Sequence, residues 1–190
     1  MKIAKSSRHS KITGDFAERL VLYWLSKHGF ECALVDHVGL DIIARNPHNQ
    51  EVMGISVKSR SRNTGTDGSS LNIPNDNLEK LDAACQAFNC KPFFALVVDE
   101  ADSITAFILT QAHLVSLFPP GKSVICWKMR KANIAQYEVD PEIRTFREAQ
   151  NKSVRGECFP FAPSIHRATR GTQDERKMYR TIVVTYSALP

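Results

Sequence analysis

Residues 39–60 read GLDIIARNPHNQEVMGISVKSR, and this stretch decides the fold. A short apolar run over 40–44 follows a glycine, and residues 46–50 have the composition of a turn. Residues 52–59 then form a second mostly apolar run, whose length suits a strand better than a helix. The stretch therefore predicts two consecutive strands joined by a short turn.

The neighbouring segments extend this hairpin into a layered domain. Residues 13–28 are predicted to form a helix that ends at Gly29, because apolar residues recur at helical spacing: Phe16, Ala17, Leu20, Val21, Trp24 and Leu25. Further segments are predicted as a strand over 30–38, a loop over 61–70, a helix over 75–89, strands at 92–98 and 103–110, a short helix at 111–118 and a strand at 123–129. The order α-β-β-β-α-β indicates an α/β fold.

The last fifty residues have a different character. A helix is predicted to begin near Pro141, and residues 151–175 contain few apolar side chains. Residues 179–186 alternate as a strand does. We therefore expect an α/β domain over residues 1–140 and a basic extension over 141–190.

Composition excludes several classes of protein. The chain has 190 residues, 43% of them hydrophobic and 24% charged, as is typical of a globular protein. The longest apolar runs are far shorter than the roughly 20 residues of a membrane-spanning helix, and no secretory signal is visible. The five cysteines form no C-x-x-C pair, which argues against a zinc ribbon and favours a reducing cytoplasm.

Positive charge is concentrated in three places. The net charge is +5, and residues 1–14, which include Lys11, contain four basic residues and no acid. Arg60 and Arg62 follow Lys58 closely, and residues 141–190 carry nine basic groups against five acids. Such clusters favour a polyanionic partner, because neutralising phosphates releases counterions; an ordinary solvated basic surface is the alternative.

Three charged residues lie where burial makes a charge costly. Glu18 falls on the apolar stripe of the first helix, Asp41 opens an apolar run after a glycine, and Lys58 ends an apolar strand. Each has an ordinary explanation when taken alone: an edge residue, a turn former and a side chain that reaches into water. Their combination favours a shared site.

The motifs G-D-F-A-E-R-L (14–20), G-L-D-I-I-A (39–44) and S-V-K-S-R (56–60), with K-P-F-F-A-L-V-V (91–98) after them, lie in one order along the chain. In that order and spacing they resemble the PD-(D/E)xK nuclease superfamily, in particular the Holliday-junction-resolvase-like branch of the restriction-endonuclease-like fold. The resemblance runs from Gly14 to about Val98 and implies an αβββαβ core with a mixed central sheet between helices.

The resemblance also implies roles for individual residues. Glu18 and Asp41 would bind Mg²⁺ or Mn²⁺ with the Val57 carbonyl, and Lys58 would be the catalytic ammonium. Carboxylates suit a hard cation, which neutralises charge on the phosphate and activates water. Arg60 and Arg62 directly follow the strand that carries Lys58 and are predicted to contact nucleic-acid phosphates beside the cleft, and Lys11 is a further candidate for binding nucleic acid.

Ser56 departs from the family pattern. It stands two residues before Lys58, where many relatives have a second acid, and a hydroxyl is a poor ligand for Mg²⁺. Three outcomes follow: weaker metal binding at a site that includes Ser56, a substitute acid such as Asp76 or Glu79, or loss of catalysis with nucleic-acid binding retained.

The expected function is metal-dependent hydrolysis of phosphodiester bonds in DNA, with branched or junction DNA as one candidate substrate. RNA is not excluded as a partner, no membrane partner is expected, and the resemblance to resolvases implies a homodimer. The alternatives are a catalytically degenerate nuclease-fold module that binds nucleic acid or a protein, and an adaptor whose basic tail meets an acidic partner.

Overall fold

A computed structural model describes residues 6–62, 70–100 and 103–149 of the chain. Its elements, in chain order, are α1 (His9–Lys27), β1 (Glu31–His37), β2 (Leu40–Arg45), β3 (Val52–Ser61), β4 (Ser70–Pro74), α2 (Asp76–Ala87), β5 (Lys91–Asp99), β6 (Ser103–Thr110), α3 (Gln111–Leu117), β7 (Val124–Lys128), α4 (Lys131–Val139) and β8 (Arg144–Ala149).

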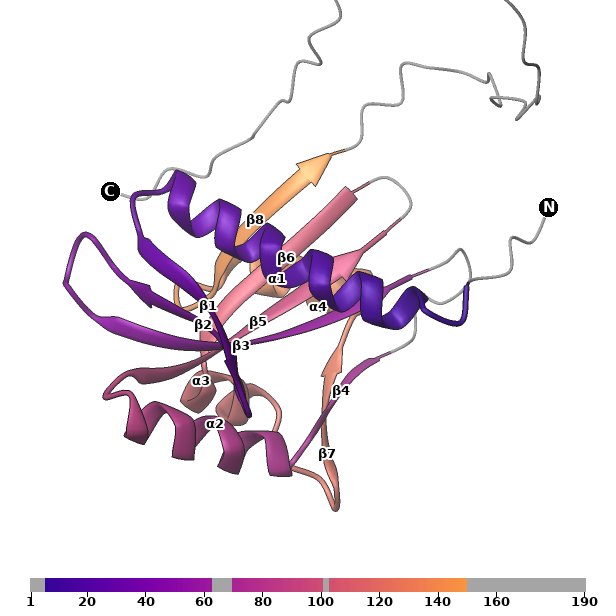
Figure 1. Cartoon of the computed structure of the whole chain (residues 1–190). Helices are drawn as coiled ribbons and strands as arrows, with labels where there is room; N and C mark the ends of the chain where they lie inside the picture. The colour runs from indigo at the N-terminus through magenta and orange to yellow at the C-terminus, as the bar shows by residue number, and fades with distance from the viewer. Residues whose placement is uncertain (1–5, 63–69, 101–102, 150–190) are drawn as a thin grey trace, which may run out of the picture.

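Six strands form the central sheet in the order β1-β2-β3-β5-β6-β8. Only β3 and β5 run parallel, since α2 lies in the crossover between them, and the other neighbours are antiparallel. Helix α1 crosses one side of this sheet, and α2 and α3 lie on the other side (Figure 1). This is the mixed sheet flanked by helices, with the αβββαβ order, that is expected for a restriction-endonuclease-like fold.

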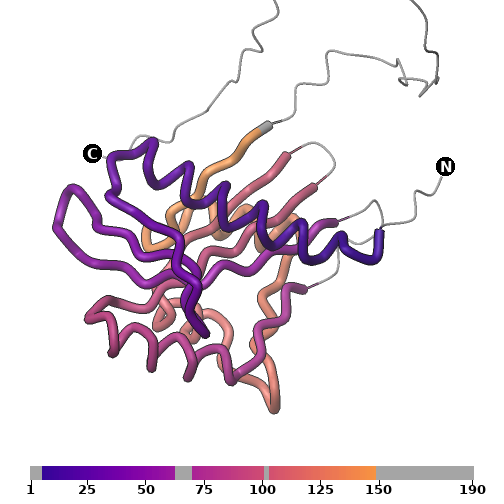
Figure 2. Tube along the Cα trace, viewed as in Figure 1, coloured from indigo at the N-terminus to yellow at the C-terminus, as the bar shows by residue number. Residues whose placement is uncertain are grey.

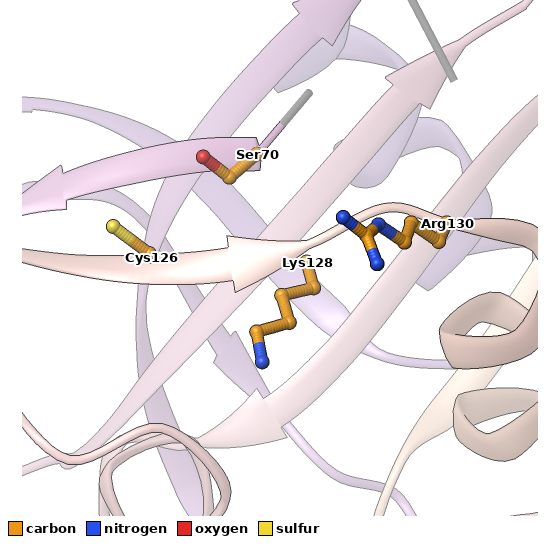
Figure 3. Close-up of a pocket in the computed structure, with 4 residues that line it drawn as sticks. All are labelled: Ser70, Cys126, Lys128 and Arg130. Carbon is orange, nitrogen blue, oxygen red and sulfur yellow. The ribbon is translucent and has the colours of Figure 1, made fainter. Parts of the chain in front are cut away.

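A separate two-stranded ribbon, β4 with β7, joins segments that are distant in the sequence (Figure 2). Ser70 pairs with Lys128 at one end, and Pro74 pairs with Val124 at the other. Residues alternate between the two faces, as the two-residue period of a strand requires. Leu71, Ile73, Ile125 and Trp127 are buried, and the opposite face includes the labelled residues Ser70, Cys126 and Lys128 (Figure 3).

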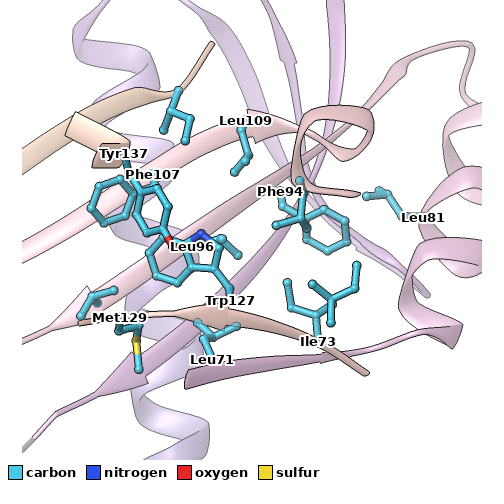
Figure 4. Packing of buried hydrophobic residues seen from close by; sticks show 14 of the residues in the cluster. Leu71, Ile73, Leu81, Phe94, Leu96, Phe107, Leu109, Trp127, Met129 and Tyr137 are labelled. Atoms are coloured by element: carbon cyan, nitrogen blue, oxygen red, sulfur yellow. The ribbon is translucent and has the colours of Figure 1, made fainter. Parts of the chain in front are cut away.

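Two hydrophobic clusters hold the layers together. On one face of the sheet, the α1 residues Ala17, Val21 and Leu25 pack against strand residues such as Ile55 and Ala95. The other cluster joins the sheet to α2, α3, α4 and the ribbon, and Figure 4 shows the aromatic rings of Phe107, Trp127 and Tyr137 within it. Both faces of the sheet are therefore covered, which explains why β5 is apolar along most of its length.

The sheet continues past the boundary expected at residue 140. The helix predicted from Pro141 is wrong: residues 144–149 form β8, which pairs with β6 from Ser103↔Ala149 to Ile108↔Arg144. Phe146 in this strand stacks on Trp24 of α1 at 4.9 Å between ring centroids. Tertiary pairing therefore outweighs the local preference for a helix after a proline.

Other predictions fared unevenly. The helices and strands up to residue 129 lie within a few residues of their predicted bounds, but β4 and α4 were missed. Phe16 is 47% exposed and so lies off the buried stripe of α1. The strand predicted at 179–186, the segment 151–175 and most of the loop at 61–70 lie outside the described residues, as does the extension predicted over 141–190 from residue 150 onward.

No helix among the described residues is long and apolar enough to cross a lipid bilayer.

Candidate active site

Asp41 lies where β2 and β3 separate. The antiparallel pairing between these strands ends at Ile42↔Ile55, while β3 continues alongside β5 as far as Ser61. The Asp41 carboxylate occupies the position beside β3 that a paired strand would otherwise fill. Its Oδ2 atom accepts hydrogen bonds from the backbone N–H of Val57 at 2.6 Å and from the Ser56 hydroxyl at 3.3 Å. These two donors hold the carboxylate in one orientation.

Ser56 connects Asp41 to Lys58. The Lys58 ammonium donates to the Ser56 hydroxyl at 2.9 Å and to the Val57 carbonyl at 3.3 Å. The serine is almost fully buried, at 1% exposure, and its single hydroxyl both donates to Asp41 and accepts from Lys58. A short polar chain therefore runs between the carboxylate and the ammonium.

Burial perturbs Lys58. It lowers the pKa of the Lys58 ammonium below its usual value, and the nearby carboxylates of Asp41 and Glu18 oppose this effect without cancelling it. Lysines with a lowered pKa occur at functional sites more often than elsewhere, because burial and neighbouring charges tune the pKa of the groups that take part in catalysis. Lys58 is therefore unlike a surface lysine at the end of a strand.

Glu18 approaches the same site from α1. It is half-buried and follows Ala17, which packs in the core beneath the helix. Burial raises the pKa of the Glu18 carboxyl, as do the neighbouring charges of Asp41 and Asp15, and together they outweigh the opposing effect of Lys58. The structure thus brings Glu18, Asp41, Ser56 and Lys58 together, from one helix and two strands.

The donor atoms at this site suit a hard divalent cation. Glu18 and Asp41 supply carboxylate oxygens and Val57 a carbonyl oxygen, which are the ligand types that such a cation prefers. Among the residues that the structure describes, no three His, Cys, Asp or Glu residues are grouped as a metal site would need. Neither Asp76, which pairs with Lys80 at 2.7 Å, nor Glu79 therefore completes a third carboxylate.

The predicted phosphate contacts separate into two kinds. Lys11 on α1 and Arg60 near the end of β3 are exposed. Arg62, in contrast, is only 8% exposed, and its Nη1 atom donates to Glu100 Oε1 at 2.7 Å and to the Met129 carbonyl at 2.9 Å. Its guanidinium is therefore held between other elements of the fold, unlike the exposed side chains of Lys11 and Arg60, and a phosphate contact by Arg62 stays a prediction.

The sequence analysis missed two basic residues next to Met129, the residue whose carbonyl accepts a hydrogen bond from Arg62. Lys128 and Arg130 flank Met129 and are both exposed. Their spacing of two residues at the end of an alternating strand places both on the outer face, a signal that the sequence does contain.

No protein-family model and no curated protein matches the chain. Among solved structures, the chain is similar to the 1.6 Å structure of Archaeoglobus fulgidus Hjc, described as a Holliday junction resolvase from an archaeal hyperthermophile. The two chains share 21% sequence identity, the match covers 65% of this chain and 88% of that one, and the TM-score is 0.48.

Proposed function

We propose that this chain is a nuclease of the PD-(D/E)xK type that hydrolyses phosphodiester bonds in DNA with the aid of Mg²⁺ or Mn²⁺, and that its substrate is branched or junction DNA. The observation that supports this most is the polar chain Asp41–Ser56–Lys58 at the point where β2 leaves β3, with Glu18 beside it. Partly buried charges of both signs, brought together in this way, are more typical of a chemical site than of a stabilising ion pair.

Each residue of the site has a distinct role in this proposal. Glu18, Asp41 and the Val57 carbonyl would hold the cation, which when bound neutralises charge on the phosphate and makes a water molecule more acidic. The backbone N–H of Val57 and the Ser56 hydroxyl fix the direction of the Asp41 carboxylate. The Lys58 ammonium stabilises the negative charge that develops as the phosphodiester bond breaks.

A second candidate deserves a test because of Ser56. With a buried hydroxyl in place of an acid, the site holds two carboxylates, which compensate less of a divalent charge than three do. A nuclease-fold module that binds nucleic acid without cutting it is consistent with this deficit.

Thermal unfolding in the presence of Mn²⁺ and Mg²⁺ distinguishes the two. A cation that binds only the native state raises the melting temperature as its concentration rises. We expect such a rise for the natural chain, no rise for Asp41→Asn, and an unchanged rise for Glu31→Gln. Glu31 is an exposed carboxylate at the far end of the β1–β2 hairpin, opposite Arg45, and controls for loss of charge alone.

Cleavage completes the test. With Mn²⁺, the natural chain should cut an end-labelled four-way junction more readily than a linear duplex of the same sequence. Lys58→Ala should abolish cutting and leave junction binding within a few-fold, since an ammonium that acts on the transition state changes rate more than affinity. A chain that binds junctions tightly but neither responds to the cation nor cuts any DNA would support the binding module instead.

A further inference from the structure

The β4–β7 ribbon presents a basic outer face. Its inner face is committed to the core through Ile73, Ile125 and Trp127, each fully buried. Its outer face carries the exposed residues Asn72, Cys126 and Lys128, with Arg130 following directly. This outer face contains positive charge and no acid.

Four residues on this face line a pocket of about 260 Å³: Ser70, Cys126, Lys128 and Arg130. Figure 3 shows them around the end of the ribbon, with the Arg130 guanidinium extended toward the strands. Among the described residues, neither Lys128 nor Arg130 has an acidic side chain within ion-pair distance. Two cations that lack an internal counter-charge create a positive potential in the pocket, which favours an anion.

The donors are those that a phosphate group needs. A guanidinium donates to two oxygens in one plane, and an ammonium supplies a compact charge. The Ser70 hydroxyl already donates to Asn72 Oδ1 at 2.8 Å, so Lys128 and Arg130 are the groups that would hold the phosphate. Such groups typically hold the sugar–phosphate backbone and position it without reading its sequence.

A hydrogen bond connects the pocket region to the end of β3, the strand that carries Lys58. Arg62 near the end of β3 donates to the carbonyl of Met129, the residue between Lys128 and Arg130. The end of the ribbon near Ser70 therefore lies at the same edge of the molecule as the end of β3 (Figure 1). A nucleic acid bound along this edge would contact both the pocket and the end of β3.

We propose that the pocket at the end of the β4–β7 ribbon binds a backbone phosphate of nucleic acid, separate from the phosphate at Glu18, Asp41 and Lys58. The inference deepens the proposed function, and it rests on that function only in taking DNA as the ligand. It adds a second anchor, whose role is to orient the nucleic acid relative to the strand that bears Lys58.

A binding experiment with a matched control tests the anchor. Junction binding is measured by fluorescence anisotropy over a range of salt concentrations, with EDTA present so that no strand is cut. The variant Lys128→Ala/Arg130→Ala should bind at least about tenfold more weakly and lower the salt slope by up to about two. The control Arg45→Ala/Lys122→Ala removes the same charge at exposed sites that do not line the pocket and should retain the natural affinity. Equal losses in both variants would overturn the proposal.

Cys126 provides a second readout in the natural chain. Its thiol is free and exposed in the pocket, so a bulky maleimide should alkylate it, as peptide mass spectrometry can follow residue by residue. Junction DNA should slow this alkylation, and high inorganic phosphate should slow it partly. Protection by an acidic peptide but not by DNA would overturn the proposal in favour of a protein partner.

The two proposals fail in different ways. If DNA protects Cys126 in the natural chain and in Asp41→Asn but neither protein cuts, the phosphate anchor stands and the nuclease proposal fails. If the natural chain cuts junctions while Cys126 stays fully reactive and the pocket variant binds normally, the anchor is absent and the nuclease proposal stands.

Discussion

At the scale of single residues, Ser56 acquires a role that its position in the motif did not suggest. The resemblance to PD-(D/E)xK nucleases predicts an acid at this position. In the structure it is a buried hydroxyl that accepts a hydrogen bond from the Lys58 ammonium and donates one to Asp41. Losing a partner at a poorly solvated polar group costs free energy of the order of 1–3 kcal/mol, and Val57 would then be the remaining hydrogen-bond partner of each charge among the described residues. Ser56 therefore stabilises the charged pair that surrounds it.

Changing Ser56 to glutamate tests whether position 56 faces the proposed cation. The variant adds a carboxylate beside Glu18 and Asp41, so we expect a lower melting temperature in metal-free buffer, because like charges repel and the new one is buried. Mg²⁺ should recover this loss and shift the melting temperature further than in the natural chain. Cleavage of junction DNA should be equal or faster.

Ser56→Ala is the matched control for that variant. It removes the hydroxyl without adding charge, so it should lower stability in buffer but leave the Mg²⁺ response close to natural. If Mg²⁺ shifted both variants by the same amount, a carboxylate at position 56 would not reach the cation and the assignment of the site would be wrong.

At the scale of elements, the start of β2 is positioned by its contact with α2. Gly39 has a φ of +87°, and a Cβ atom placed there would lie 2.6 Å from the carbonyl carbon and oxygen of Lys80. The absence of a side chain allows the two backbones to approach this closely. Since Asp41 lies two residues further along, this approach also sets where its carboxylate meets β3.

Gly39→Ala should therefore destabilise the fold by at least about 2 kcal/mol, because the new Cβ meets backbone and the φ is strained for alanine. Urea unfolding followed by circular dichroism measures the change. Gly14→Ala is the control: its Cβ meets nothing within 4 Å in α1, so stability should be retained or rise by about 0.5–1 kcal/mol. Similar effects at the two positions would show that α2 does not approach β2 as described.

At the scale of the whole molecule, Arg62 links the paired strands β3 and β5 to the end of β7 in the separate ribbon. It extends from the end of β3, pairs with Glu100 just after β5 and holds the Met129 carbonyl just after β7. Its side chain is 5% exposed, whereas that of Glu100 is 42% exposed, so the glutamate can be solvated if the arginine is lost. The buried carbonyl has no such alternative.

Arg62→Met should consequently cost about 1–3 kcal/mol of stability, mainly through the lost hydrogen bonds. Arg60→Ala, at an exposed neighbour, should stay within about 0.5 kcal/mol of the natural chain. The two variants should differ in the opposite way in DNA binding. The dependence of the binding constant on salt concentration should become less steep, by up to about one unit of slope, for Arg60→Ala and remain unchanged for folded Arg62→Met. A slope that fell only for Arg62→Met would identify Arg62 as a phosphate contact.

Much of this architecture was predictable from local patterns. The hairpin of β2 and β3, helix α1 and strands β5 and β6 follow from short runs whose periodicity matches their structure. Placing Asp41 and Lys58 on adjacent strands, with Glu18 on the preceding helix, follows from the same patterns together with the family resemblance. Alternation along one segment suffices for such predictions, because each element carries its own signal.

Tertiary structure alone decided the rest. Phe146 lies in a strand because β6 offers an unpaired edge and Trp24 a ring to stack on, and neither is visible near Pro141 in the sequence. The burial of Arg62 and the bridging role of Ser56 likewise depend on groups contributed by other elements. A residue's own segment records its periodicity, but the partners that satisfy its charge or its backbone come from distant segments, and these are fixed only when the chain packs.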